Sequence, residues 1–296
     1  MTTIRRPNGS IIGASVIPIG TGGGNIPGIW CRNEHYSLLT SGVFPTPSYQ
    51  ISILIAGGGG GGENGAGGAG GLVIRSSVTV YREAHTITIG NGGAVQYDGG
   101  YSSIEGSSLG LIKALGGGAG GYSSIYGTGH SGNDGHAGGS GGGASEWRGG
   151  GVSTSPGAAL QPTSIWGGYG NRGSDASPYN RTGSGGGAGG VPTVNTGTGQ
   201  NNGGIGIFSS ITGTSTMYCA GGSVNAYSVS YNTTGAGAVN SGNGGGRYSI
   251  GGSGILIISY KSPGQQGSGG VTTWYVDGNG DKWWVHKFTS SGTYSG

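Results

Sequence analysis

The sequence has little charge, almost no cysteine and no long apolar run. Charged residues make up 8% of the 296 residues, the net charge is +3, and no cluster of Lys and Arg is larger than Arg5-Arg6. We therefore expect no binding of nucleic acid, which requires a concentrated basic surface. No apolar segment approaches the roughly 20 residues that span a bilayer, so membrane insertion is not expected. Cys31 and Cys219 are too far apart to give a metal-binding spacing or a disulfide framework.

Motifs of catalysis are also missing. Glycine-rich sequence matches G-x-G-x-x-G repeatedly, and residues 138–142 match G-x-S-x-G, but none of these matches lies between a strand and a helix. His130, Asp134 and His136 are close in sequence, but no second carboxylate or further ligand is spaced to close a catalytic or metal site. We predict a protein that is not an enzyme and has no cofactor.

One segment resembles the start of a calcium-binding loop. Asp277, Asn279 and Asp281 fit the D-x-N-x-D pattern, but Phe288 stands at the twelfth position, where the loop needs an acidic residue. Asn279-Gly280 is itself a turn signal. We interpret the segment as a solvated hairpin turn and keep these three residues as a weak calcium candidate.

Glycine is what the sequence has in excess. It accounts for 79 residues, whereas average usage is about 7%. The absence of a strict G-X-Y repeat and the presence of only 10 prolines exclude a collagen helix. Disordered chains usually combine high net charge with few aromatics, but this one has 16 Tyr and 6 Trp. We therefore expect an ordered fold built on glycine.

Two short apolar runs, residues 51–56 and 254–260, have the composition of buried strands bounded by glycine. We predict that they pair or pack in one sheet. Further strands are predicted at 71–74, 77–81, 85–89, 101–104 and 109–115. Asn91-Gly92 predicts a turn. The predicted fold is mainly β, with a small antiparallel sandwich or jelly-roll-like sheet.

The composition divides the chain into three regions. Residues 1–48 contain five prolines and are interpreted as an extended attachment arm, and residues 49–261 form a glycine-rich β domain. Residues 262–296 are a linker and a hairpin of strands 271–276 and 282–288. For the glycine-rich middle, residues 116–253, two structures are open: a bundle of polyproline-II-like glycine helices, or long loops on a β scaffold.

Aromatic residues punctuate the glycine tracts and could form a local core or be displayed for binding. The candidates for ligand binding are Trp147, Trp166, Tyr169, Tyr179, Tyr227 and Tyr231. The candidates for assembly are Trp30, Phe44, Trp274, Trp283 and Trp284.

The order of three motifs carries a resemblance. Thr40-Ser-Gly-Val-Phe44, the strand at 51–56 that runs into glycine, and Gly254-Ile-Leu-Ile-Ile-Ser-Tyr260 resemble a glycine-rich domain of phage and bacterial surface proteins, over residues 35–261. Residues 28–36 are similar to structural proteins of phages, particularly cyanobacterial phages. Phage adhesins with polyglycine-II cores are similar in the middle region.

The resemblance implies a virion structural protein on the surface of the extracellular particle. The expected role is a tail-fibre or receptor-binding component that contacts host cell-surface glycan. Residues 1–48 would bind other virion proteins, and a homo-oligomer is expected. The alternative is a self-assembling architectural subunit, such as a capsid decoration or a filament with C-terminal strand exchange. A polyglycine ice-binding or matrix protein is a third reading.

Overall fold

The computed structural model describes residues 48–122, 134–145, 154–176, 182–193, 201–224 and 235–296. The chain divides into two units, Met1–Ser48 and Tyr49–Gly296, and the description below concerns the second. The described residues form strands, turns and extended segments and no helix, which confirms the prediction of a mainly β fold. In these ranges no helix has the length and apolar character that crossing a membrane requires.

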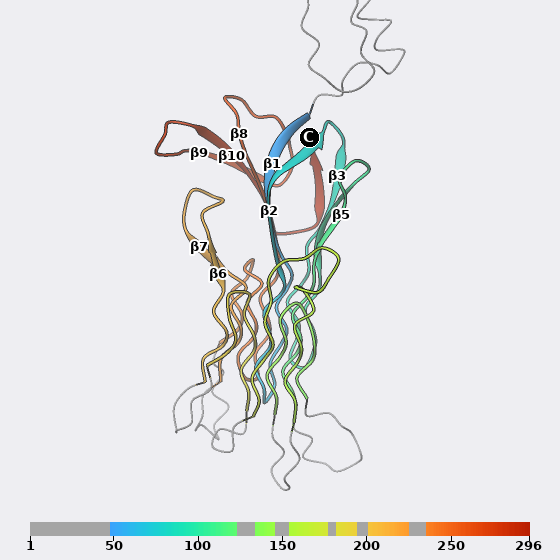
Figure 1. Ribbon diagram of the computed structural model, residues 1–296, viewed down its shortest axis with the longest axis vertical. Coiled ribbons are helices and arrows are strands. Elements are labelled where there is room, and N and C mark those ends of the chain that lie inside the picture. The colour runs from blue at the N-terminus through green and yellow to red at the C-terminus, as the bar shows by residue number, and fades with distance from the viewer. Residues whose placement is uncertain (1–47, 123–133, 146–153, 177–181, 194–200, 225–234) are drawn as a thin grey trace, which may run out of the picture. The chain divides into compact units, whose positions relative to one another are not determined.

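Eleven strands are present in the described residues, and they form three sheets (Figure 1). A five-stranded sheet has the order β2-β1-β8-β10-β9, a four-stranded sheet the order β11-β3-β4-β5, and β6 pairs with β7. The bounds are β1 Ser48–Ala56, β2 Leu72–Tyr81, β3 Ala84–Thr88, β4 Ser102–Gly106, β5 Gly110–Ala114, β6 Ile207–Ser209, β7 Thr216–Tyr218, β8 Ile255–Lys261, β9 Val271–Val276, β10 Lys282–Phe288 and β11 Gly292–Ser295.

The two apolar runs lie side by side at the centre of the five-stranded sheet. β1 pairs antiparallel with β8, with Leu54 opposite Ile257, which confirms the predicted pairing. Both strands are apolar on both faces because both faces are covered. Ile53 and Ile258 point into a core shared with Ile104 of the four-stranded sheet. Leu54, Ile257 and Val285 point the other way, into a second core that includes Tyr218 and Cys219.

This arrangement confirms the predicted antiparallel sandwich. Burying an Ile or Leu side chain fully stabilises a fold by about 1.5–3 kcal/mol. The largest fully buried side chains are concentrated in the paired sheets, so they provide the conventional hydrophobic part of the unit.

Two local predictions need correction. The runs 71–74 and 77–81 belong to one strand, β2, in which Ser77 has a φ of 56°. The chain does not turn at Asn91-Gly92; the Tyr97 amide donates to the Ala94 carbonyl at 2.9 Å, which places the turn at residues 95 and 96. Gly92 serves close packing instead, because a Cβ there would meet the Gly251 oxygen at 1.9 Å.

The sequence-based division separates the C-terminal hairpin from the glycine-rich domain, but the hairpin strands belong to the same sheet as β1 and β8. β10 pairs with β8, with Val285 opposite Ser259, and β9 extends the sheet beyond β10. β11 pairs with β3 in the four-stranded sheet. The last strands of the chain therefore complete both sheets of the sandwich.

Below the sheets, β1 continues into the glycine run 57–62, where the hydrogen-bonding pattern changes. The amides of Gly57 and Gly60, three residues apart, donate to the same neighbouring segment, at Gly71 and Gly68. The intervening amides donate to two other segments. Those pairs are Gly58–Gly100 and Gly61–Tyr97 on one side, and Gly59–Gly252 and Gly62–Ser249 on the other. A β-strand alternates between two directions, whereas a repeat of three is the geometry of a helix with three residues per turn.

The neighbouring segment 65–71 repeats the pattern on all its sides. The amides of residues 65, 68 and 71 donate to 121, 118 and 115; those of 66 and 69 donate to 183 and 186; and those of 67 and 70 donate to 245 and 242. The neighbours at 115–121 and 242–245 run antiparallel to this segment, because their residue numbers fall as those of the segment rise. The neighbour at 183–186 runs parallel to it, because its numbers rise. The described part of the glycine-rich middle is therefore a bundle of polyglycine-II-like helices. They are the extended segments that run side by side below the sheets in Figure 1.

Candidate functional site

One end of the bundle gathers the parts of the chain that flank five internal segments. These segments are 123–133, 146–153, 177–181, 194–200 and 225–234, which lie outside the described residues. Their flanks are bonded to one another: the Gly121 amide donates to Gly143, Ala144 to Ser174, and Asn201 to Val224, at 2.9–3.0 Å. Gly246 donates to Gly235 in the same way. The described residues that flank these five segments therefore lie together at the end of the bundle remote from the sheets (Figure 1).

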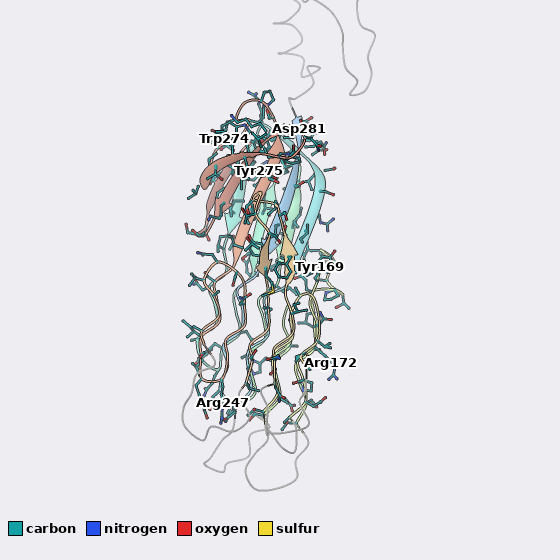
Figure 2. The ribbon with its side chains drawn as sticks, turned by 90° about the vertical axis from the view of Figure 1, so that its left-hand side faces the viewer. Tyr169, Arg172, Arg247, Trp274, Tyr275 and Asp281 are labelled. Atoms are coloured by element: carbon teal, nitrogen blue, oxygen red, sulfur yellow. The ribbon has the colours of Figure 1, made fainter. Side chains whose placement is uncertain are left out.

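Polar side chains of the described residues also lie toward this end. Asn64 Oδ1 accepts from Arg247 Nη2 at 2.9 Å and from the Tyr248 hydroxyl at 2.7 Å, and the Arg247 guanidinium lies 5.0 Å from the Tyr248 ring centre. Figure 2 shows Arg247 low in the bundle and Trp274 at the opposite, sheet-bearing end. The contacts on Asn64 join residues 183 or more apart in sequence. They therefore hold the first segment of the bundle along the chain against the last one.

Of the six residues predicted to bind ligand, Trp166 and Tyr169 are described, and each contacts a different part of the sheets. Tyr169 exchanges backbone hydrogen bonds with Leu72 of β2, at 2.8 and 3.1 Å, and the Trp166 carbonyl accepts from Arg75 at 2.7 Å. Lys113 Nζ lies 3.9 Å from the Tyr101 ring centre and 5.3 Å from that of Trp166. Tyr169 lies where the sheets meet the bundle, well away from Arg247 (Figure 2). Trp147, Tyr179, Tyr227 and Tyr231 lie outside the described residues.

The three described assembly candidates lie on the β9–β10 hairpin. Trp274 is directly opposite Trp284, and Lys282 Nζ is 4.5 Å from both ring centres. On the other face, Trp283 stacks on Tyr275 with the rings 6.4 Å apart and 7° from parallel. Trp274 is 56% exposed, so the hairpin presents an aromatic surface with one cation in it. Trp30 and Phe44 lie outside the described residues.

The weak calcium candidate forms a hydrogen-bonded turn. Asp277 Oδ1 accepts from the amides of Asn279 and Asp281, and its Oδ2 accepts from the Trp283 indole at 3.0 Å. The indole bond and the two amide bonds hold the pKa of Asp277 below its usual value. Asp281 pairs with Lys261 at 2.5 Å. The Asp277 carboxylate is thus engaged within the hairpin and that of Asp281 with β8, rather than both pointing at a common centre.

No group of three or more His, Cys, Asp or Glu in the described ranges could hold a metal ion. Two residues of the predicted His130, Asp134 and His136 cluster have other partners. Asp134 accepts a hydrogen bond from the Ser155 amide, and His136 Nδ1 lies 3.0 Å from Asp98 Oδ1. His130 lies outside the described residues.

Sequence reasoning missed a buried network between the sheets. His286 Nε2 lies 3.1 Å from the Tyr260 hydroxyl, and its Nδ1 lies 2.9 Å from the Gly269 carbonyl. Burial lowers the pKa of His286, so the ring is neutral at pH 7. The Tyr260 hydroxyl also accepts the amides of residues 266 and 267, so the network fixes the connection before β9. The alternation of β10, which places His286 on the face of Trp284 and Phe288, was the signal that could have predicted its burial.

A family model described as a glycine-rich domain matches residues 39–283. The match covers more than half of the chain, and the chain belongs to this family. No curated protein and no solved structure matches the chain significantly.

Proposed function

We propose that this member of the glycine-rich domain family is a non-enzymatic structural protein of a phage particle, a tail-fibre or receptor-binding component that binds glycan on the host cell. The observation that carries the proposal is the meeting of the flanks of five internal segments at one end of the glycine bundle. The segments are thereby attached to a common base of regular backbone.

The bundle suits this role because its own backbone holds it together. Consecutive amides of residues 57–62 and 65–71 are satisfied by neighbouring carbonyls, and a Cβ added at the glycines of these two tracts would overlap a neighbouring segment. The described tracts fill the interior of the bundle themselves, so in this proposal the sequences of the five segments can change without disturbing it. Recognition residues are commonly placed on loops fixed to a rigid scaffold.

The composition of these segments agrees with glycan binding. They contain Trp147, Tyr179, Tyr227 and Tyr231, four of the six predicted ligand-binding residues. Tyr and Trp combine a flat apolar ring with a hydrogen-bonding group, which suits the alternating apolar and hydroxyl surfaces of a sugar. In this proposal the protein is exposed at the particle surface, and residues 1–48 bind another virion protein.

The alternative of C-terminal strand exchange has no observation in its favour, because β10 and β11 pair within their own chain. An exchange would first have to remove both strands from the sandwich.

Binding of the full-length protein to an array of bacterial lipopolysaccharides and capsular polysaccharides tests the proposal. We expect the protein to bind, and the double variant Trp147→Ala/Tyr227→Ala to bind at least about tenfold more weakly, as for loss of about 1.4 kcal/mol. Tyr81→Ala is the matched control, since Tyr81 is a 38%-exposed aromatic in the sheets. Absence of binding to every polysaccharide, or equal binding by the double variant, would refute the proposal.

A further inference from the structure

Three of the four outer strands of the two larger sheets are covered along part of their free edge. β2 exchanges hydrogen bonds with Tyr169 and contains Ser77, whose positive φ departs from regular strand geometry. β11 is bridged by Ser268, which exchanges two backbone bonds with Ser295 at 2.8 and 3.0 Å. Beside β5, the Gln161 side chain accepts the Leu115 amide at 2.7 Å. These are devices that prevent a free strand from pairing with another chain.

β9 has none of these devices. It is paired with β10 along its whole length, and in the described part of the chain no backbone group bonds to its other edge. Residues 271–276 contain no charge, no proline and no positive φ. Val271, Trp274 and Val276 are 59, 56 and 54% exposed. An exposed neutral edge rich in β-branched and aromatic residues is a template for a further strand.

We propose that β9 pairs antiparallel with β9 of a second copy of this chain, across a two-fold axis at Trp274. Residues directly opposite in an antiparallel pair lie on the same face, and in this register every pair meets that condition. Trp274 lies opposite its own copy, Thr272 opposite Val276, and Thr273 opposite Tyr275. The two five-stranded sheets then form one continuous sheet of ten strands.

Charge complementarity favours a second copy over an unrelated strand. In this register Asp277 lies opposite Val271 of the second copy, and Val271 is itself paired with Lys287 on β10. Asp277 and the second copy's Lys287 are therefore two strand spacings apart, about 10 Å between Cα atoms, and on the same face. The exposed Lys287 side chain is long enough to approach the carboxylate. The two-fold axis repeats this contact at both ends of the pair of β9 strands.

The location of β9 is compatible with pairing. The β9–β10 hairpin reaches outward from the other strands in Figure 1, and Figure 2 shows Trp274 at the end of the unit opposite to Arg247. Joining two copies here leaves free the opposite end of each bundle, where the flanks of the five internal segments meet. The inference is independent of the proposed function, since it concerns only the sheet edge.

The mass of the full-length protein in solution, measured by light scattering after gel filtration, is the first test. We expect a dimer at micromolar concentration and a monomer for Trp274→Lys, which places a charge opposite its own copy at the axis. Lys287→Glu should raise the dimer dissociation constant at least about tenfold, and Lys287→Arg should leave it unchanged. A monomeric wild-type protein, or a dimer unaffected by Trp274→Lys, would overturn the inference. Unchanged circular dichroism would show that the variants fold.

A cysteine cross-link tests the register directly, in a Cys31→Ser background. Trp274→Cys should form a disulfide-linked dimer on mild oxidation, because opposite residues have Cα atoms about 4.5–5.5 Å apart, within the disulfide range. Thr273→Cys is the control, since its own copy would be about 8 Å away, beyond that range. Efficient cross-linking at 273 and none at 274 would contradict the proposed axis.

Discussion

Replacing one glycine inside the bundle should destabilise the whole unit. At Gly67, an added Cβ would lie 2.0 Å from the Gly60 oxygen and 2.5 Å from the Gly60 carbonyl carbon. Ordinary contact begins at 3.4 Å, so the overlap with the oxygen is about 1.4 Å (3.4 minus 2.0). The obstructing atoms are backbone atoms, which cannot rotate away, and moving the Gly60 carbonyl breaks the hydrogen bond that it accepts from the Gly245 amide. Overpacking of a close-packed interior costs about 1–3 kcal/mol and sometimes more, and we expect Gly67→Ala to cost about 3 kcal/mol or more.

The assay is thermal unfolding of the full-length protein followed by calorimetry. A loss of about 3 kcal/mol corresponds to a fall in Tm of about 6–12 °C for a unit of this size. Gly278→Ala is the matched control, because an added Cβ there meets nothing within 4 Å and its φ is not positive. The control should change stability by less than about 1 kcal/mol, since it only restricts the unfolded chain. Equal Tm values for the two variants would refute the packing argument.

Two further predictions concern the sandwich. Tyr294→Phe removes a buried hydroxyl that lies 2.5 Å from the Tyr49 hydroxyl, so denaturant unfolding should show a loss of about 1 kcal/mol; Tyr97→Phe, at a 68%-exposed position, should show none. Burial lowers the pKa of both His85 and His286 below the ordinary 6.5, so the folded protein binds fewer protons than the unfolded chain. Stability should therefore be level above about pH 7 and fall as the pH drops through 6.5 and below, and a Tm that rises on acidification would contradict this.

The sequence could predict the parts of the fold in which side chains carry the information. The runs 51–56 and 254–260 are apolar except for one serine each, Ser52 and Ser259, and such runs form strands buried on both faces. The hairpin of β9 and β10 was equally clear, because two β-rich runs flank a turn of Asp, Asn and Gly. The short β6 and β7 were missed, since three residues give no measurable alternation.

The bundle could be proposed from the sequence but not distinguished from loops. Glycine has no side chain, so a tract such as 116–121 looks the same whichever neighbours it has. The threefold order appears only in the hydrogen bonds, where Gly118 donates to Ser140 and Gly121 to Gly143. The turn predicted at Asn91-Gly92 was wrong for the same reason. Gly92 is needed because the Gly251 backbone lies against it, and not because the chain turns there.

The candidate site was predicted only in outline. Trp166 and Tyr169 were chosen because they are aromatic and near glycine. The structure places Trp166 beside Lys113 and Arg75, and Tyr169 beside Leu72, through contacts between residues far apart in sequence. The open edge of β9 likewise depends on which strand ends the sheet, and a linear pattern does not reveal that order.

Amide hydrogen exchange of the full-length protein, resolved by mass spectrometry, tests the central claim most directly. If the glycine tracts are helices bonded to their neighbours, the amides of residues 57–71 should exchange as slowly as those of β8, although these residues carry almost no side chains. Exchange of that peptide at the rate of an unstructured chain, while β8 stays protected, would show that the tracts are loops and would contradict the account.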